Sequence, residues 1–163
     1  LPEVGFDGFV RLDSLIVDVS SVFEAYLRIE LAVRLLPFGY HVDDGNKAPA
    51  PLFKDAGLYS VHPDIIIRRD GTIVAILDAK YKPDPKEADR YEVLSFMDAM
   101  NVGVGGFVCP AIETDTSRYL GETATGKQLF SLRYDLGMVD PGAESDRFAQ
   151  NVLQMIEGRR HFI

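Results

Sequence analysis

The chain has 163 residues, of which 47% are hydrophobic and 26% charged, a balance that predicts one globular domain with a hydrophobic core. Its net charge of −8 argues against a domain that holds nucleic acid by bulk electrostatics, although carboxylates in a metal site remain compatible with nucleic-acid chemistry. The single cysteine, Cys109, excludes an internal disulfide and a multi-cysteine zinc site. Because the chain has neither a membrane-spanning apolar run nor a signal-peptide pattern, we expect a cytoplasmic domain excised from a longer chain.

The N-terminal part divides into a lead-in and a helix. Residues 1–18 mix glycine, proline and short apolar pairs, and we interpret them as a lead-in segment. Over 19–36, apolar residues recur at steps of three and four, which predicts a helix with one apolar face. We expect Ser20 or Ser21 to cap its start and Pro37 to end it.

The stretch 61–82, VHPDIIIRRDGTIVAILDAKYK, organises the chain. It follows a long connection over 37–58 that is rich in proline and glycine and has a short predicted strand near Tyr40. Its two near-continuous apolar runs predict strands that are buried on both faces. Asp70-Gly71 between them predicts a tight turn, so the stretch should form a β-hairpin.

The register of this hairpin decides which side chains meet. A two-residue turn would pair Asp64 with Leu77, whereas a three-residue turn or an equivalent bulge would pair Asp64 with Asp78. Side chains on one face of a strand repeat every two residues, so the second register sets Asp64, Asp78 and Lys80 on one face. We predict the second register.

The remaining elements complete an α/β pattern. We predict a helix over 86–101, a buried strand over 102–108 and a polar surface loop over 111–127. Alternation over 128–136 predicts a strand with one solvent-exposed face near an edge of the sheet, and a last helix follows over 143–157. This order predicts a single α/β domain whose central mixed β-sheet is flanked by helices, with the 86–101 helix crossing over between two strands.

The end of the hairpin is a candidate metal site. A pair of strand-end aspartates is more often a solvated rim than a site, but Lys80 changes that balance. Its ammonium could neutralise charge that develops on a scissile phosphate, or position the attacking water. Asp64 and Asp78 would then hold Mg²⁺, for which Mn²⁺ can substitute, because this hard cation prefers oxygen ligands. The backbone carbonyl of Ala79 could complete the ligand set.

The Pro-Asp pair at 63–64, followed after a hairpin by Asp-Ala-Lys at 78–80, resembles the PD-(D/E)xK nuclease superfamily, which implies a restriction-endonuclease-like core. The flanking sequence resembles the McrC-type endonuclease subunit of methylcytosine-dependent restriction systems over about residues 12–110. The stretches that carry this second resemblance are VFEAYL (22–27), HPDIII (62–67), ILDAKYK (76–82), DRYEVLSF (89–96) and VGGFVCP (104–110).

The resemblance implies that residues 1–163 form one nuclease domain, a Mg²⁺-dependent DNA endonuclease that cleaves for a McrBC-like restriction system. It implies metal ligation by Asp64 and Asp78, a catalytic role for Lys80, and Glu24 as a further metal or water ligand. Without the resemblance, Glu24 would be interpreted as an exposed helix residue at the border of the apolar face. The family also implies an AAA+ GTPase partner that recruits the nuclease, and restriction nucleases often cut DNA as dimers.

Four further side chains are candidates for contact with DNA or phosphate: Arg28, Lys82, Tyr91 and Glu92. The family usually has a glutamine where Glu92 stands, so an acid there would tune the site or weaken a backbone contact. Tyr91 is interpreted first as a core residue, and Arg28 and Lys82 could equally face solvent.

Two alternative functions remain open at this point. A non-catalytic member of the same fold could act as a partner-docking module, although the intact set of Glu24, Asp64, Asp78 and Lys80 argues against it. A metal-dependent nuclease of a repair or orphan defence system would carry the same catalytic residues, which therefore do not separate it from a restriction nuclease.

Overall fold

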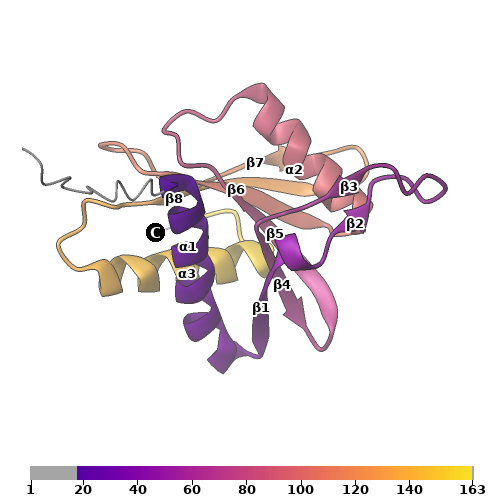
Figure 1. Ribbon diagram of the computed structural model, residues 1–163. Coiled ribbons are helices and arrows are strands. Elements are labelled where there is room, and N and C mark those ends of the chain that lie inside the picture. Colours follow the sequence, from indigo (N-terminus) through magenta and orange to yellow (C-terminus); the bar gives the residue numbers. More distant parts are fainter. Residues whose placement is uncertain (1–17, 163) are drawn as a thin grey trace, which may run out of the picture.

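The computed structural model describes residues 18–162, which form an α/β domain with helices on both faces of a mixed sheet (Figure 1). The predicted lead-in segment lies, apart from Asp18, outside the described residues. Within the described part, the six strands of this sheet are β1 (Tyr40–Asp44), β4 (Ile65–Arg69), β5 (Thr72–Ala79), β6 (Val104–Pro110), β7 (Arg118–Glu122) and β8 (Gln128–Tyr134). The helices are α1 (Val19–Leu35), α2 (Glu87–Ala99) and α3 (Pro141–Ile156), with 3-10 turns η1 (Leu36–Phe38) and η2 (Gly45–Lys47). No helix in residues 18–162 has the length and apolar character needed to cross a bilayer.

The spatial order of the sheet is β1-β4-β5-β6-β8-β7. β5, β6 and β8 are parallel neighbours, while β1, β4 and β7 pair antiparallel to theirs. α2 connects the parallel strands β5 and β6, as the predicted crossover requires. A second sheet consists of β2 (Ala50–Pro51) and β3 (Ser60–Val61), and it lies in an arm that projects from the body (Figure 1).

The apolar runs of the hairpin fill two cores, one on each face of the sheet. Ile65 and Ile67 pack with α1 and α3, whereas Ile66 and Ile76 pack with α2. All four are at most 1% exposed. This two-sided burial explains why the sequence shows near-continuous apolar runs and no alternation.

A bulge sets the hairpin register. The turn at Asp70-Gly71 has two residues with φ values of 51° and 78°, the left-handed geometry of a tight hairpin turn. Arg68 pairs with Ile73 but Ile67 pairs with Ala75, so Val74 is an extra residue in β5. The pairing then continues to Ile65 and Leu77, and the next position sets Asp64 beside Asp78. The predicted register is confirmed, and it is the bulge that produces it.

The start of α1 differs from the prediction in its cap. The side chain of Asp18 accepts a hydrogen bond from the Ser20 backbone N–H at 3.0 Å, so Asp18 is the N-cap and the predicted serine caps are wrong. The hydroxyl group of Ser21 instead donates to the Asp18 carboxylate at 2.7 Å. A carboxylate at this position also interacts favourably with the helix dipole.

Two predictions for the C-terminal half are wrong. The predicted surface loop over 111–127 contains strand β7, which forms an edge of the sheet. Strand β8 lies next to this edge, as predicted, but it has no solvent-exposed face. Ser131 and Arg133 are 1% and 5% exposed, although both were expected to face water. The backbone N–H of Arg133 donates to Ser117 Oγ at 2.9 Å, and the Arg133 side chain donates to the Pro83 carbonyl at 2.8 Å, so the segment after β5 covers this position.

Candidate active site

The two aspartates of the hairpin meet where β4 begins and β5 ends. The backbone N–H of Ala79 donates to Asp64 Oδ2 at 2.7 Å, which fixes this carboxyl group across the two strands. Asp78 is 4% exposed and its carboxyl group lies within hydrogen-bonding reach of that of Asp64. The structure therefore brings together two acidic side chains that the sequence separates by fourteen positions.

Burial and nearby charges perturb both carboxyl groups. The pKa of Asp64 is raised to about 8, first by burial and then by the charge of Asp78, against a smaller lowering by the Ala79 N–H. Burial also raises the pKa of Asp78, and the ammonium of Lys80 opposes that rise. A solvated rim would not show such shifts, because water would stabilise both ionised forms.

Lys80 lies between two acids. Its Nζ atom contacts Asp78 Oδ2 at 2.5 Å and Glu92 Oε2 at 2.7 Å. Burial alone would lower the pKa of Lys80, but the hydrogen bonds to Asp78 and Glu92 raise it above its ordinary value. Lys80 is therefore held in its charged form, on the same face as Asp78, and Glu92 from α2 is its second partner.

The buried oxygen atoms at this point could hold a divalent cation. Asp78 Oδ2 contacts Lys80 in an ion pair but has no hydrogen bond of ordinary geometry with any described residue. The N–H and C=O of one strand residue point to the same side, so the Ala79 carbonyl faces Asp64, to which the Ala79 N–H donates. Two carboxylates and a carbonyl are ligands of the kind that Mg²⁺ takes in proteins, together with water.

Glu24 lies at the margin of this cluster. Its side chain is 22% exposed, as expected for a half-buried carboxylate, and its charge contributes to the raised pKa of Asp64. Glu24 Oε1 accepts from Arg28 at 3.2 Å and from Asn46 Nδ2 at 2.9 Å. No three His, Cys, Asp or Glu side chains among residues 18–162 are grouped as a ready-made metal site, so Glu24 does not complete one with the two aspartates.

The loop after β1 also supports the site, although its sequence does not predict such a role. Besides the bond from Asn46 to Glu24, the Gly45 N–H donates to the Asp64 backbone carbonyl at 3.3 Å. A Cβ at position 45 would lie 1.8 Å from the Pro63 carbonyl oxygen, so only glycine fits there. The Asp-Gly-Asn turn at 44–46 was the available signal, but it does not indicate where the turn packs.

The candidate DNA contacts have different surroundings. Lys82 is bound to the buried Asp89 at 2.7 Å, and Arg28 is bound to Glu24 and to Asp44 at 3.6 Å. Tyr91 is 61% exposed, so its interpretation as a core residue is wrong. It lies on the outer side of α2, where it donates to Glu87.

A buried arginine also fixes the segment that follows Lys80. Arg133 on β8 donates to the Pro83 carbonyl at 2.8 Å and pairs with Asp115 at 3.5 Å. The polar alternation of β8 predicted a solvent-facing arginine and gave no sign of this contact. Cys109 is buried, as predicted, and burial raises the pKa of its thiol to about 11, so it is no nucleophile.

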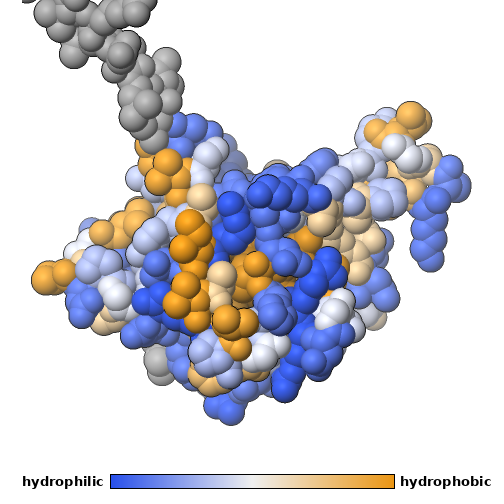
Figure 2. All heavy atoms as spheres, turned by 60° about the horizontal axis from the view of Figure 1, so that its bottom comes forward, coloured by the Kyte–Doolittle hydropathy of each residue, from blue (hydrophilic) through white to orange (hydrophobic). Residues whose placement is uncertain are grey.

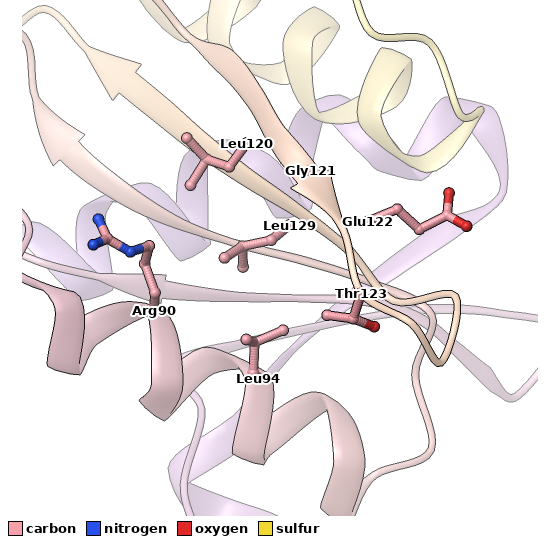
Figure 3. A pocket seen from close by; sticks show the side chains of 7 residues that line it. All are labelled: Arg90, Leu94, Leu120, Gly121, Glu122, Thr123 and Leu129. Carbon is pink, nitrogen blue, oxygen red and sulfur yellow. The ribbon is translucent and has the colours of Figure 1, made fainter.

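A separate hollow between α2 and β7 does not include the acidic cluster (Figure 3). Leu94, Leu120 and Leu129 point into it and Arg90 lies at its rim, whereas Glu122 points away (Figure 3). Its lining has no pair of carboxylates and no nucleophile. The acidic cluster at the open end of the hairpin therefore remains the candidate site.

Residues 7–99 match the model of a family described as McrBC 5-methylcytosine restriction system component. This range is more than half of the 163-residue chain. The chain belongs to this family. The match includes α1, the hairpin and α2, and so all the candidate catalytic residues. A comparison with curated proteins gives no match.

The fold is also similar to a solved structure. That structure is a refined half-complex from a tetradecameric assembly of Thermococcus gammatolerans McrB AAA+ hexamers with bound McrC. The alignment has a TM-score of 0.62 and 17% sequence identity, and it covers 83% of this chain and 34% of the other. The chain therefore spans about a third of the length of the chain it resembles, and the likeness concerns the fold.

Proposed function

We propose that this domain is the cleavage domain of a McrBC-type restriction system, a Mg²⁺-dependent DNA endonuclease with the PD-(D/E)xK arrangement and fold. The observation that carries the proposal is the contact of Asp64, Asp78 and Lys80 at the end of one hairpin. The bulge in β5 sets the register on which this contact depends. Membership of the McrBC component family supports the choice of a restriction system over a repair or orphan defence role.

Asp64, Asp78 and the Ala79 carbonyl would hold the metal ion. Mg²⁺, when bound, would polarise the phosphoryl oxygen and lower the pKa of a coordinated water. The metal would also offset the burial of the Asp64 carboxyl group and the nearby charge of Asp78, which together raise the pKa of Asp64 to about 8. Glu24, at the margin, would orient a water or an outer ligand, with Asn46 and Arg28 fixing its position.

Lys80 would act as a fixed positive charge and not as a base. Its raised pKa keeps the ammonium protonated at neutral pH, so it cannot accept a proton from water. It would instead donate to the phosphate as negative charge develops there. Glu92 competes with the phosphate for this ammonium, and so tunes the site in the way that the glutamine-to-glutamate difference suggested.

The acidic charge of the domain supports a division of labour. A net charge of −8 disfavours tight binding of DNA by this domain alone, so recognition would come from other parts of the assembly. The similar solved structure contains McrB AAA+ hexamers with bound McrC. A GTP-hydrolysing AAA+ partner is accordingly proposed here as the component that recruits the domain to DNA, and cutting both strands would require two nuclease domains.

The test is metal-dependent cleavage of DNA by the full-length protein, with and without its AAA+ partner. Lys80→Ala and Asp78→Ala should each lower the cleavage rate by about 100-fold or more. Asp98→Ala and Arg159→Ala are the matched controls, because these side chains are exposed and lie outside the cluster. Their rates should equal that of the parent. Parent-like cleavage by both site variants would disprove the proposal.

A further inference from the structure

The segment from residue 45 to 62, GNKAPAPLFKDAGLYSVH, forms the arm that projects from the body of the domain (Figures 1 and 2). Its stem is the β2–β3 pair, and the Leu52 N–H extends the pairing by donating to the Tyr59 carbonyl at 2.9 Å. Pro49 and Pro51 fix their own φ angles and stiffen the stem. The arm is thus a hydrogen-bonded hairpin and not an irregular loop.

The root of the arm is joined to the proposed catalytic carboxylates. Gly45 bonds to the backbone of Asp64, and Asn46 bonds to Glu24, so the first two arm residues contact the acidic cluster. At the other strand of the stem, Val61 is buried in the core that α2 covers. These contacts set the direction in which the arm leaves the site.

The tip of the arm exposes large apolar side chains that belong to neither hydrophobic core. Phe53, Leu58 and Tyr59 are 49%, 83% and 60% exposed. The rings of Phe53 and Tyr59 pack edge to face with their centroids 6.0 Å apart. Figure 2 shows hydrophobic side chains at the projecting end of the arm. An exposed apolar cluster on a protruding element marks a surface that meets another molecule.

The arm differs in charge from the rest of the domain. Its two lysines and one aspartate (Lys47, Lys54 and Asp55) give +1, whereas the whole chain carries −8, so the other residues sum to −9. The Lys47 side chain is 84% exposed. Lys54 is also exposed, and it has no ion pair with the described residues. Lys47 is paired with Asp44 at 3.7 Å. The arm therefore offers cations to an anionic molecule, whereas the rest of the chain is acidic overall.

We infer that the arm holds DNA at the active site, with Lys47 and Lys54 on phosphates and the Phe53–Leu58–Tyr59 tip against bases. The choice of DNA as the ligand rests on the proposed nuclease function, since the arm begins at the carboxylates on which a scissile phosphate would lie. Aromatic side chains stack on bases and apolar side chains wedge between base steps, while lysines neutralise the backbone. A purely protein partner would account for the apolar tip but not for the junction with the catalytic cluster.

The experiment measures the affinity of the full-length protein for a short fluorescein-labelled DNA duplex by anisotropy, with Ca²⁺ in place of Mg²⁺. A double variant, Phe53→Ala with Tyr59→Ala, should weaken binding by about tenfold or more without changing the salt dependence. A second, Lys47→Ala with Lys54→Ala, should weaken binding and flatten the slope of log K against log salt by about 2.

Phe38→Ala is the matched control, because Phe38 is 56% exposed and lies at the opposite end of α1 from Glu24. It should bind DNA like the parent. Thermal unfolding of each variant should match the parent, since the changed side chains are exposed. A 2-aminopurine base in the duplex should brighten on binding of the parent and less on binding of the tip variant, as expected for unstacking.

The results distinguish a failure of the assignment of the arm to DNA binding from a failure of the nuclease proposal. Parent-like affinity in both double variants, or no affinity of the parent for the duplex, would overturn the assignment of the arm. Unchanged DNA affinity with loss of the AAA+ partner would also overturn it and would make the arm a protein-docking element. Arm-dependent DNA binding combined with parent-like cleavage by both Lys80→Ala and Asp78→Ala would support the arm and disprove the nuclease mechanism.

Discussion

Two regions of this domain bury carboxylates, and they differ in the hydrogen-bond donors that surround the buried groups. Glu144 on α3 is fully buried, yet it accepts from the Asp135 N–H at 2.6 Å and from Arg147 Nε at 2.7 Å. Asp64 and Asp78 instead lie against each other, with the Ala79 N–H and the Lys80 ammonium as the main compensating groups. Hydrogen-bond donors match the buried charge of Glu144, whereas the charges of Asp64 and Asp78 are only partly matched.

The difference separates a structural acid from the acids proposed to be functional. Burying an ionised carboxylate is costly unless donors replace the water that it loses. Around Glu144 the backbone and Arg147 supply those donors, and the pKa of Arg147 is raised chiefly by its hydrogen bond to Glu144. Around Asp64 and Asp78 the supply is incomplete, so both pKa values rise and Asp78 Oδ2 keeps unused bonding capacity. That capacity suits the cation proposed to bind there.

The largest effect on stability is expected from Glu144→Gln. This change removes the charge that Arg147 bonds and should lower the free energy of unfolding by about 3 kcal/mol. Urea unfolding measures the loss, and Glu157→Gln, at an exposed and loosely paired position, is the control. Cleavage per folded molecule should not change. A variant as stable as the parent would contradict the view that this carboxylate holds the fold.

Asp64→Asn should have the opposite sign. Without metal at pH 9, replacing a repelled carboxylate by a neutral amide should raise the free energy of unfolding by about 2 kcal/mol. Cleavage should fall by about 100-fold or more, because a metal ligand is lost. Asp98→Asn, at an exposed position, should change neither quantity. A destabilised Asp64→Asn protein would place Asp64 with Glu144 among the structural acids.

The pH dependence of stability gives a smaller, graded effect. The folded-state pKa of Asp64, about 8, exceeds the ordinary value of 3.8, so the folded state binds the extra proton between these values. This group therefore contributes stability that is complete below about pH 4 and is lost progressively as the pH rises through about 8. Unfolding in EDTA at several pH values measures the slope. It should shrink in Asp64→Asn and when Mg²⁺ is added, and an equal slope in all three would contradict the assignment.

Much of the hairpin over 61–82 could be predicted from its sequence. Two apolar runs around Asp70-Gly71 specify buried strands and a tight turn, because few other structures satisfy that pattern. The alternation of Asp78 and Lys80 on one face follows from strand geometry alone. The pairing of Asp64 with Asp78 depended on an extra residue, and no local signal located it at Val74.

The predictions failed where another part of the chain decides the environment. Arg133 and Ser131 alternate with apolar residues as in a half-exposed strand, but both are buried, and the Arg133 side chain donates to the Pro83 carbonyl and pairs with Asp115. Tyr91 has the apolar spacing of a core residue, yet α2 turns it to solvent. Local patterns indicate which side chains of a segment prefer burial, but actual burial also depends on what packs over the segment.

The sequence by itself determined the strands of the hairpin, the helical period of α1 and the acids and lysine available for chemistry, since propensity, periodicity and side-chain type are local properties. Only the tertiary structure decided that Glu92 shares Lys80 with Asp78 and that Asn46 reaches Glu24. The same packing decided that one pair of acids is left electrostatically incomplete while Glu144 is satisfied. Each of these depends on distances between residues far apart in the chain, and burial, which sets their energies, exists only once the layers have packed.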